Sequence, residues 1–231
     1  MAKASTALAL AEPKTPAVVG AMPDYMNKST GRGNENVEAA HLQIPRIKLL
    51  QKMSDEVDRH HINFVEGAQD GHFLNSLTRE NYGDSVYVIS LKFKDEYVVW
   101  KERTAGGGLL GSFKTEAEAK AAIATQEKPQ DFTISPTHSH VLLIKDATTG
   151  ALSKPVIMDF SSSKLRVSRN WNSQIDIKGG DRFAALWKLS SVAAKAKNNA
   201  QFMNLEVEFM GWSTEEDYRV AENYYAQFSG N

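Results

Sequence analysis

The chain has 231 residues, and at roughly 150 residues per domain this length predicts one large domain, or one domain with extensions. Its 42% hydrophobic and 24% charged residues are typical of a globular protein, and its formal net charge is only −1. The sequence has no cysteine, which excludes disulfides, cysteine-ligated zinc, iron–sulfur clusters and thiol nucleophiles. No apolar run approaches the roughly 20 residues of a membrane helix. The short apolar stretch near the start ends at Glu12, so we expect no export signal.

Residues 1–36 have the composition of a flexible arm, with seven Ala, three Pro and three Gly and no sustained period. Ordered structure is predicted to begin near His41. Pro45 lacks a backbone donor, so it favours an edge strand or an extended segment at that point rather than a central strand. Residues 54–71 are polar and rich in His and Asp, which predicts a loop.

Residues 84–103 predict a β-hairpin, because Phe93-Lys94-Asp95-Glu96 can form a tight turn between two apolar runs. In that register one face forms core and consists of Tyr87, Ile89, Leu91, Phe93, Val98 and Trp100. The opposite face points outward and consists of Val86, Val88, Ser90, Lys92, Tyr97, Val99, Lys101 and Arg103.

The next elements alternate between helices and strands. Residues 115–126 predict a short Ala-rich helix with acidic residues in its first turn. Residues 138–145 and 155–160 predict a second hairpin. Ser161-Ser162-Ser163 can cap a helix of about 14 residues, whose inner stripe is Val167, Trp171 and Ile175.

The C-terminal third adds two strands and a helix. One strand buries Phe183, Ala185, Trp187 and Leu189, and a later one buries Leu205, Val207 and Phe209. Ser213-Thr214-Glu215-Glu216 predicts a capping box that opens a last helix to about Phe228. The apolar stripe of that helix packs either on its own sheet or, as a regulated contact, near the basic part of the chain or on a partner protein. Together the elements predict a mainly β, α+β fold, an antiparallel barrel or sandwich with helical insertions.

Charge is distributed unevenly along the chain. Residues 160–200 carry eight Lys or Arg against two Asp, a net charge of +6. Residues 201–231 carry one Arg against six Asp or Glu, a net charge of −5. A basic block followed by an acidic end favours a polyanionic partner, although solvated faces of ordinary elements would look the same.

Two patterns suggest metal chemistry. His138 and His140 alternate on a strand as metal ligands can, but zinc would need a further ligand, so exposed histidines at the start of a strand are the simpler interpretation. Asp159, Asp176 and Lys178 resemble the two acids and one lysine of metal-dependent nucleases, in which carboxylates hold Mg²⁺.

A strand-rich fold with cations beside aromatic rings is what single-stranded nucleic acid requires, since cations contact phosphates and rings stack on bases. One candidate group shares the outward face of the first hairpin: Lys92, Tyr97, Lys101 and Arg103. A second group comes from the basic block: Lys164, Arg166, Arg169, Arg182 and Lys188. Tyr97 is the predicted stacking residue, while Trp100 and Trp187 are predicted to be core.

Several segments resemble a widespread group of bacteriophage proteins over about residues 30–212. They are Gly31-Arg32-Gly33-Asn34-Glu35, Ile44-Pro45-Arg46-Ile47-Lys48-Leu49-Leu50-Gln51, Gly71-His72-Phe73-Leu74-Asn75, Tyr97-Val98-Val99-Trp100, Gly106-Gly107-Gly108 and Ser163-Lys164-Leu165-Arg166-Val167-Ser168-Arg169-Asn170-Trp171-Asn172. The resemblance is to replication-associated single-stranded-DNA-binding proteins, and it implies an OB-type barrel. Such proteins often end in a disordered acidic tail, whereas this chain ends in a capped helix.

We therefore expect a flexible arm (1–36), an OB-like nucleic-acid-binding domain (37–212) and an acidic C-terminal helix (213–231). The expected function is non-enzymatic, without cofactor or metal. The protein would coat single-stranded DNA during replication or recombination in the cytoplasm of an infected bacterium, with phage replication or recombination proteins as further partners and no membrane contact. The alternatives are a metal-dependent nuclease and a structural or host-interaction protein of the phage.

Overall fold

A computed structural model of the chain describes residues 33, 35–36, 43–196 and 198–229, without the side chains of Arg103 and Ser229. The chain divides into two units, residues 1–43 and 44–231. The predicted N-terminal arm lies almost wholly outside the described residues, as does His41, where ordered structure was expected to begin. Every strand and helix discussed below belongs to the second unit.

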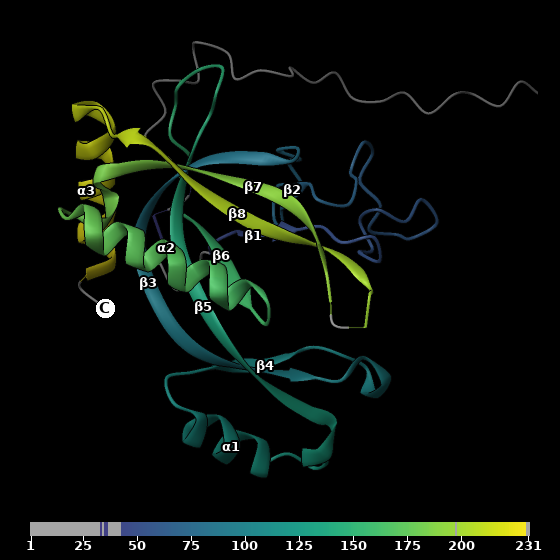
Figure 1. Cartoon of the computed structure of the whole chain (residues 1–231). Coiled ribbons are helices and arrows are strands. Elements are labelled where there is room, and N and C mark those ends of the chain that lie inside the picture. The colour runs from purple at the N-terminus through teal and green to yellow at the C-terminus, as the bar shows by residue number, and fades with distance from the viewer. Residues whose placement is uncertain (1–32, 34, 37–42, 197, 230–231) are drawn as a thin grey trace, which may run out of the picture. The chain divides into compact units, whose positions relative to one another are not determined.

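The second unit is built on one curled sheet in the order β2-β1-β6-β5-β3-β7-β8, with β4 paired to β3 (Figure 1). Only the β1–β6 pair is parallel among the described strands. The mainly β, α+β class is therefore confirmed. The strands are β1 Arg46–Leu49, β2 Phe73–Asn75, β3 Ser85–Lys101, β4 Leu109–Phe113, β5 Phe132–Lys145, β6 Val156–Ser161, β7 Ala185–Lys195 and β8 Gln201–Trp212.

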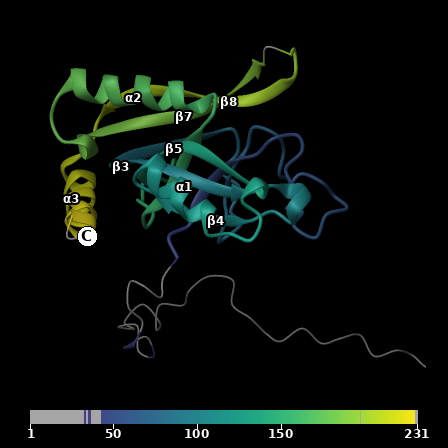
Figure 2. The same cartoon turned by 90° about the horizontal axis from the view of Figure 1, so that it is seen from below.

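Three α-helices accompany the sheet in the described residues: α1 Glu116–Ala124, α2 Lys164–Lys178 and α3 Glu215–Ser229. Short 3-10 helices cover Arg103–Ala105 (η3), Pro129–Asp131 (η4) and Arg182–Ala184 (η5). Helix α2 contacts β5, β6 and β8, whereas α3 packs against β3 and η5. In Figure 2 helix α2 runs beside the strands labelled β7 and β8. No helix in the described ranges is long and apolar enough to span a membrane.

Two hydrophobic clusters hold this arrangement. Beneath α2, Trp171 is fully buried with Val88, Phe160, Trp187 and Leu189, and Val167 and Ile175 pack against the same cluster as predicted. Beneath α3, Ala221 is fully buried beside Ile89, Leu91, Leu143 and Phe183, with Tyr218 and Phe228 packed around them. The apolar stripe of the last helix therefore docks on its own sheet.

The predicted hairpin at residues 84–103 is wrong, because β3 is one continuous strand of 17 residues. The supposed turn at Phe93–Glu96 pairs instead with Thr137–His140 of β5, within a ladder of fourteen register pairs. Lys94-Asp95 also lacks the Gly that tight hairpin turns prefer. Pairing with a long partner strand thus satisfies more backbone groups than a local turn would.

The two predicted faces of this segment are also partly wrong. The pairing of β3 with β5 shifts register between Ser90 and Lys92, which leaves Leu91 as an extra residue and reverses the alternation beyond it. Val86, Val88 and Val99, predicted to point outward, are buried. Trp100, predicted to be core, is 47% exposed.

Pro45 does not place its segment at an edge, since β1 lies between β2 and β6. Pro45 precedes the strand, and its carbonyl accepts a hydrogen bond of 2.8 Å from Ile157 N. The missing donor therefore costs no ladder bond.

The other predicted elements are confirmed, with small changes at their ends. Phe183, predicted to lie in a strand with Ala185, lies instead in η5 and packs in the cluster beneath α3. Helix α1 begins with a capping box between Thr115 and Glu118. Ser163 precedes α2 but makes no side-chain cap hydrogen bond. At α3 the cap is Thr214 rather than Ser213, since the Thr214 hydroxyl accepts from Asp217 N at 3.2 Å.

The sheet curls so far that the loop after β1 reaches β8, although β2 and β8, the ends of the described sheet, do not pair. Gln51 Nε2 donates to Met203 O at 3.0 Å, and Met203 N donates to Gln51 Oε1 at 2.9 Å. The side-chain amide of Gln51 thus takes the place of a strand that would pair with β8 and close the barrel. This is a half-barrel, and the OB-type barrel that the resemblance implied is not confirmed.

Gly71 should be more sensitive to substitution than the nearby Gly67. Both have positive φ, 86° and 76°, but a Cβ at Gly71 would lie 2.7 Å from Met203 Cε and 2.9 Å from Ser191 Oγ, while nothing lies within 4 Å at Gly67. Gly67→Ala should cost about 1 kcal/mol of unfolding free energy from backbone strain. Gly71→Ala should cost about 1–2 kcal/mol more from overpacking. Urea denaturation measures both, and equal losses would contradict this contact between the loop and β8.

Candidate nucleic-acid interface

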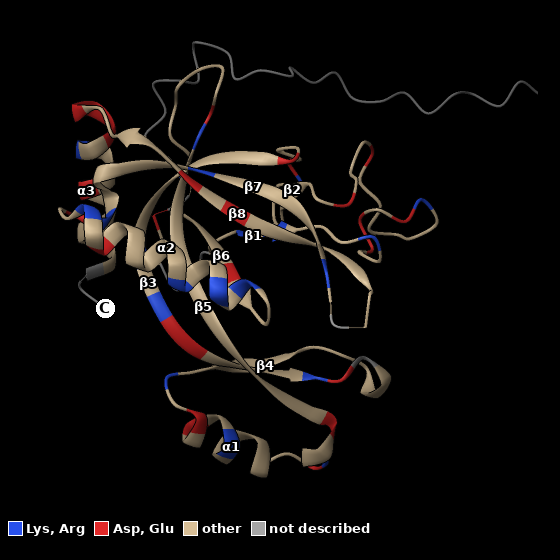
Figure 3. Ribbon diagram, in the orientation of Figure 1, with Lys and Arg blue, Asp and Glu red and all other residues tan. Residues whose placement is uncertain are grey.

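Three of the predicted cations lie in the first half of α2. Arg166 and Arg169 are exposed and Lys164 is half-buried, and Figure 3 shows blue residues gathered at this end of the helix. The first turn of α2 contains no acidic residue. The positive end of the helix dipole therefore adds to the charge of the side chains instead of being neutralised.

An exposed tryptophan lies next to one of these cations. Trp100 lines a pocket of about 580 Å³ together with three cations, Arg46, Lys48 and Lys164, and three acids, Asp55, Glu56 and Asp159. Arg46 pairs with Asp159 and Lys48 with Glu56, so Lys164 is the cation of this lining that makes no ion pair with a described residue. A neighbouring pocket of about 570 Å³ joins Trp100 to the predicted cation Lys101. Lys101 and Lys164, which are far apart in sequence, thus each line a pocket that Trp100 also lines.

Trp100 and Arg46 are the residues that sequence reasoning missed at this place. The expectation that Trp100 is core followed from a strict alternation along a hairpin that does not exist. Tyr97, the predicted stacking residue, is half-buried in the middle of the sheet, where its register partners are Phe113 of β4 and Pro136 of β5. No local signal in the sequence distinguishes these two aromatic residues.

Other predicted cations are used inside the fold or lie apart from Trp100. Lys92 Nζ donates to Phe228 O of α3 at 2.6 Å. Lys188 is half-buried on β7 opposite Glu208 of β8. Arg182 Nε donates to Ser90 Oγ at 3.0 Å, and its Nη2 donates to Asn172 Oδ1. Arg103 opens η3, but its side chain lies outside the described part.

Helix α2 is attached to the sheet by a buried polar chain centred on Ser168. The Ser168 hydroxyl lies 2.8 Å from His138 Nδ1 and 2.7 Å from His140 Nε2. All three residues are buried, so the prediction of exposed histidines at the start of a strand is wrong. His140 also stacks on Trp171 with ring centroids 4.6 Å apart.

The direction of these hydrogen bonds follows from Arg182, which can only donate. Its Nη2 lies 3.4 Å from His140 Nδ1, which must therefore accept. His140 Nε2–H then donates to Ser168, and the Ser168 hydroxyl donates to His138 Nδ1. His138 is left with its proton on Nε2, 3.7 Å from Asp95 Oδ1. The chain is complete only while both imidazoles are neutral.

The pKa values agree with that neutral state. Burial, helped by the charge of Arg182, holds the pKa of His140 well below its usual value. Burial also lowers the pKa of His138, against an opposing effect of Asp95. Burial lowers the pKa of Arg182 to about 10, which still leaves it charged near neutral pH.

The residues of the alternative nuclease site are engaged elsewhere or exposed. Asp159 forms an ion pair with Arg46 and accepts from Ser139 Oγ at 2.7 Å. Asp176 is exposed in the last turn of α2, and Lys178 Nζ lies 3.6 Å from the ring centroid of Phe209. Within the described residues, no group of three or more His, Asp or Glu side chains could hold a metal ion.

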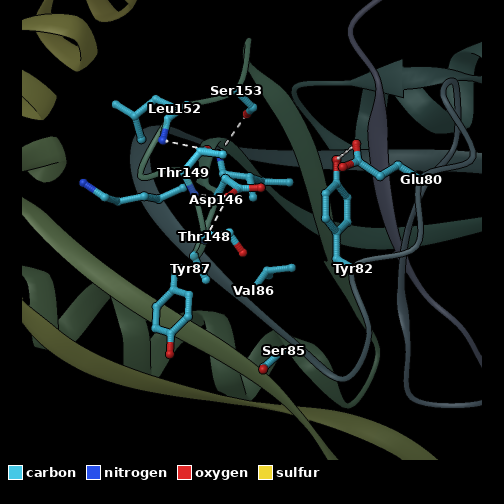
Figure 4. A pocket seen from close by; sticks show the side chains of 14 residues that line it. Glu80, Tyr82, Ser85, Val86, Tyr87, Asp146, Thr148, Thr149, Leu152 and Ser153 are labelled. Atoms are coloured by element: carbon cyan, nitrogen blue, oxygen red, sulfur yellow. Dashed lines mark hydrogen bonds between the residues drawn. The ribbon is translucent and has the colours of Figure 1, made fainter. Parts of the chain in front are cut away.

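A separate pocket of about 470 Å³ lies beside the β5–β6 turn (Figure 4). Asp146 uses its Oδ1 to accept from Thr148 N and Thr149 N, at 2.8 and 2.6 Å. Tyr82 donates to Glu80 at 2.8 Å, and burial raises the pKa of Tyr82 to about 12. Because its main polar groups are engaged with each other, we assign no ligand to this pocket.

These observations define a mainly β protein with a cationic helix on one face of a curled half-barrel and an exposed tryptophan beside the first turn of that helix. Its sequence matches the Pam3 phage gp34-like protein family over residues 14–231. The chain therefore belongs to this family, and it is a bacteriophage protein. No curated protein and no solved structure matches it.

The neutral histidines predict a pH-dependent stability. An unfolded histidine binds a proton below about pH 6.5, whereas buried His140 does not, so the unfolding free energy should fall as the pH drops below that value. The slope contributed by His140 should approach about 1.4 kcal/mol per pH unit. Urea denaturation between pH 7.5 and 5 measures it. His140→Gln should flatten the profile, and an unchanged slope in that variant would contradict the assignment.

Proposed function

We propose that this phage protein binds single-stranded DNA and coats exposed strands during replication or recombination in the cytoplasm of the infected host. It would do so without catalysis, with other phage replication or recombination proteins as further partners. A relation of its half-barrel to OB-type barrels is part of this proposal. The observation that carries the proposal is the exposed Trp100 ring beside Arg46, Lys101 and Lys164.

A ring and cations in this arrangement match the two chemical features of a single strand. Base faces are free to stack on an aromatic side chain only when they are unpaired, and stacking contributes about 1–3 kcal/mol per base. Phosphates attract Lys and Arg and release counterions on binding. Duplex DNA offers the phosphates but not the base faces, so the ring favours single strands.

The first half of α2 extends the cationic surface away from the ring. Lys164 lines the Trp100 pocket, and Arg166 and Arg169 follow it on the same helix and are exposed. A strand whose base stacks on Trp100 could continue with its backbone along these side chains. The buried chain through Ser168 and the two histidines would hold α2 in place for this contact.

The first test is a salt titration of binding to single- and double-stranded oligonucleotides of equal length. Wild-type protein should prefer the single strand and weaken steeply as salt rises. Trp100→Ala should weaken binding by about 1–3 kcal/mol. Trp212→Ala is the matched control, because Trp212 is 58% exposed, against 47% for Trp100, but lies at the end of β8.

Equal affinity for duplex, or equal effects of the two tryptophan substitutions, would contradict the proposal. Mg²⁺-dependent cleavage of either DNA would favour the nuclease alternative instead. Absence of binding at low salt would favour a structural or host-interaction role.

The second test concerns the cations of α2. Arg166→Ala and Arg169→Ala should each reduce the slope of log affinity against log salt by about 0.7, the value for one phosphate contact on a single strand. Arg219→Ala on α3 is the control, because that arginine is exposed but is paired with Glu215 and Glu222. If all three variants had the same slope as wild type, the DNA path along α2 would be wrong.

A further inference from the structure

The Trp100 surface contains more than a flat ring, because two adjoining pockets share the same three residues. The pocket of about 580 Å³ and a smaller recess of about 60 Å³ are both lined by Arg46, Trp100 and Asp159. These residues come from β1, β3 and β6, so rigid strands position them. The larger volume lies within the range of small-molecule sites.

The polar part of this site is an ion pair that remains accessible. Arg46 pairs with Asp159, and the side chains are 42% and 29% exposed. Ser139 Oγ donates to Asp159 Oδ1 at 2.7 Å, which holds the carboxylate in place from the other side. A carboxylate has about four lone-pair sites, so Asp159 can still accept two hydrogen bonds. Arg46 likewise has donors to spare beyond its contact with Asp159.

We propose that this site takes one unpaired base of the DNA strand, and that guanine is the base it fits. This rests on the proposed function. The Watson–Crick edge of guanine presents a carbonyl acceptor followed by two N–H donors. Arg46 beside Asp159 presents the complement, a donor followed by a carboxylate that can accept twice. Adenine, cytosine and thymine each offer one donor group on that edge, so Asp159 would lose its second hydrogen bond.

Lys164 supplies the place for the neighbouring phosphate. It lines the same pocket and is half-buried, and its ammonium makes no ion pair or hydrogen bond with any described residue. Burial without a partner lowers the pKa of Lys164. An anion bound there would offset that desolvation. In this proposal Trp100 stacks on the base, Arg46 and Asp159 bind its Watson–Crick edge, and Lys164 binds the neighbouring phosphate.

The test uses the intact protein and three oligonucleotides: oligo(dT), the same strand with one central guanine, and the same strand with hypoxanthine at that position. Hypoxanthine lacks only the 2-amino group, so it removes one donor to Asp159. The guanine strand should bind about 5- to 150-fold more tightly than oligo(dT), the range expected for a bidentate base contact. The strand with hypoxanthine should lose most of that gain in affinity over oligo(dT).

A variant with a matched control locates the effect. Asp159→Asn should bring the ratio of guanine to hypoxanthine affinity close to one. Asp176→Asn, which changes an exposed acid at the end of α2, should keep the wild-type ratio. The oligonucleotide comparison does not depend on any variant, so it remains decisive if Asp159→Asn fails to fold.

The outcomes separate this inference from the proposed function. If the three strands bind equally well, the guanine site is wrong while single-stranded-DNA binding stands. If no strand binds, the proposed function fails and the guanine site fails with it. If free deoxyguanosine monophosphate binds as tightly as the guanine strand, the site serves a free nucleotide and the assignment to a strand base is overturned.

Discussion

The continuous pairing of β3 with β5 is the constraint on which the rest of the structure depends. Fourteen register pairs join these strands, and β3 is also paired with β7 in its first half and with β4 in its second half. Because residues 93–96 are themselves paired with β5, they cannot form the turn of a hairpin. The extra residue at Leu91 then determines which side chains face α2 and which face the opposite side. Beyond that residue Val98 and Val99 are both buried, so Trp100 is exposed because it lies near the end of the strand's covered stretch and not because of its face alone.

The two faces of the sheet carry different helices, and each is attached by a different kind of contact. Helix α3 is held mainly by apolar packing, with the Lys145–Asp217 ion pair and the Lys92–Phe228 hydrogen bond at its border. Helix α2 combines a buried Trp171 with the hydrogen-bonded chain from Arg182 to His138. Burying a polar group without a hydrogen-bond partner costs free energy. The chain therefore favours the one position of α2 in which all of its members are paired. That precision matters for a helix whose exposed side carries the cations.

The basic block of the sequence therefore has two uses in the structure. Arg182 and Lys92 are engaged within the fold, whereas Lys164, Arg166 and Arg169 remain available to an anion. A count of charges along the chain cannot separate these groups, because burial and partners are properties of the folded state. The family match assigns the chain to phage proteins without indicating a function, and no curated protein or solved structure matches the chain. The functional proposal rests on the chemistry around Trp100.

The sequence by itself determined the β-rich class, α1 with acidic residues in its first turn, the β5–β6 hairpin, the stripe of Val167, Trp171 and Ile175, and the alternation in β7 and β8. Each of these depends on residues close together in the chain, where periodicity and capping are direct signals. Only the tertiary structure decided that β3 is a single strand, that His138 and His140 are buried around Ser168, and that Gln51 contacts Met203. It also decided that Trp100 rather than Tyr97 is exposed. The reason is physical: a strand's partner and register are set by backbone hydrogen bonds to distant residues, and a shift of one residue reverses every side chain beyond it.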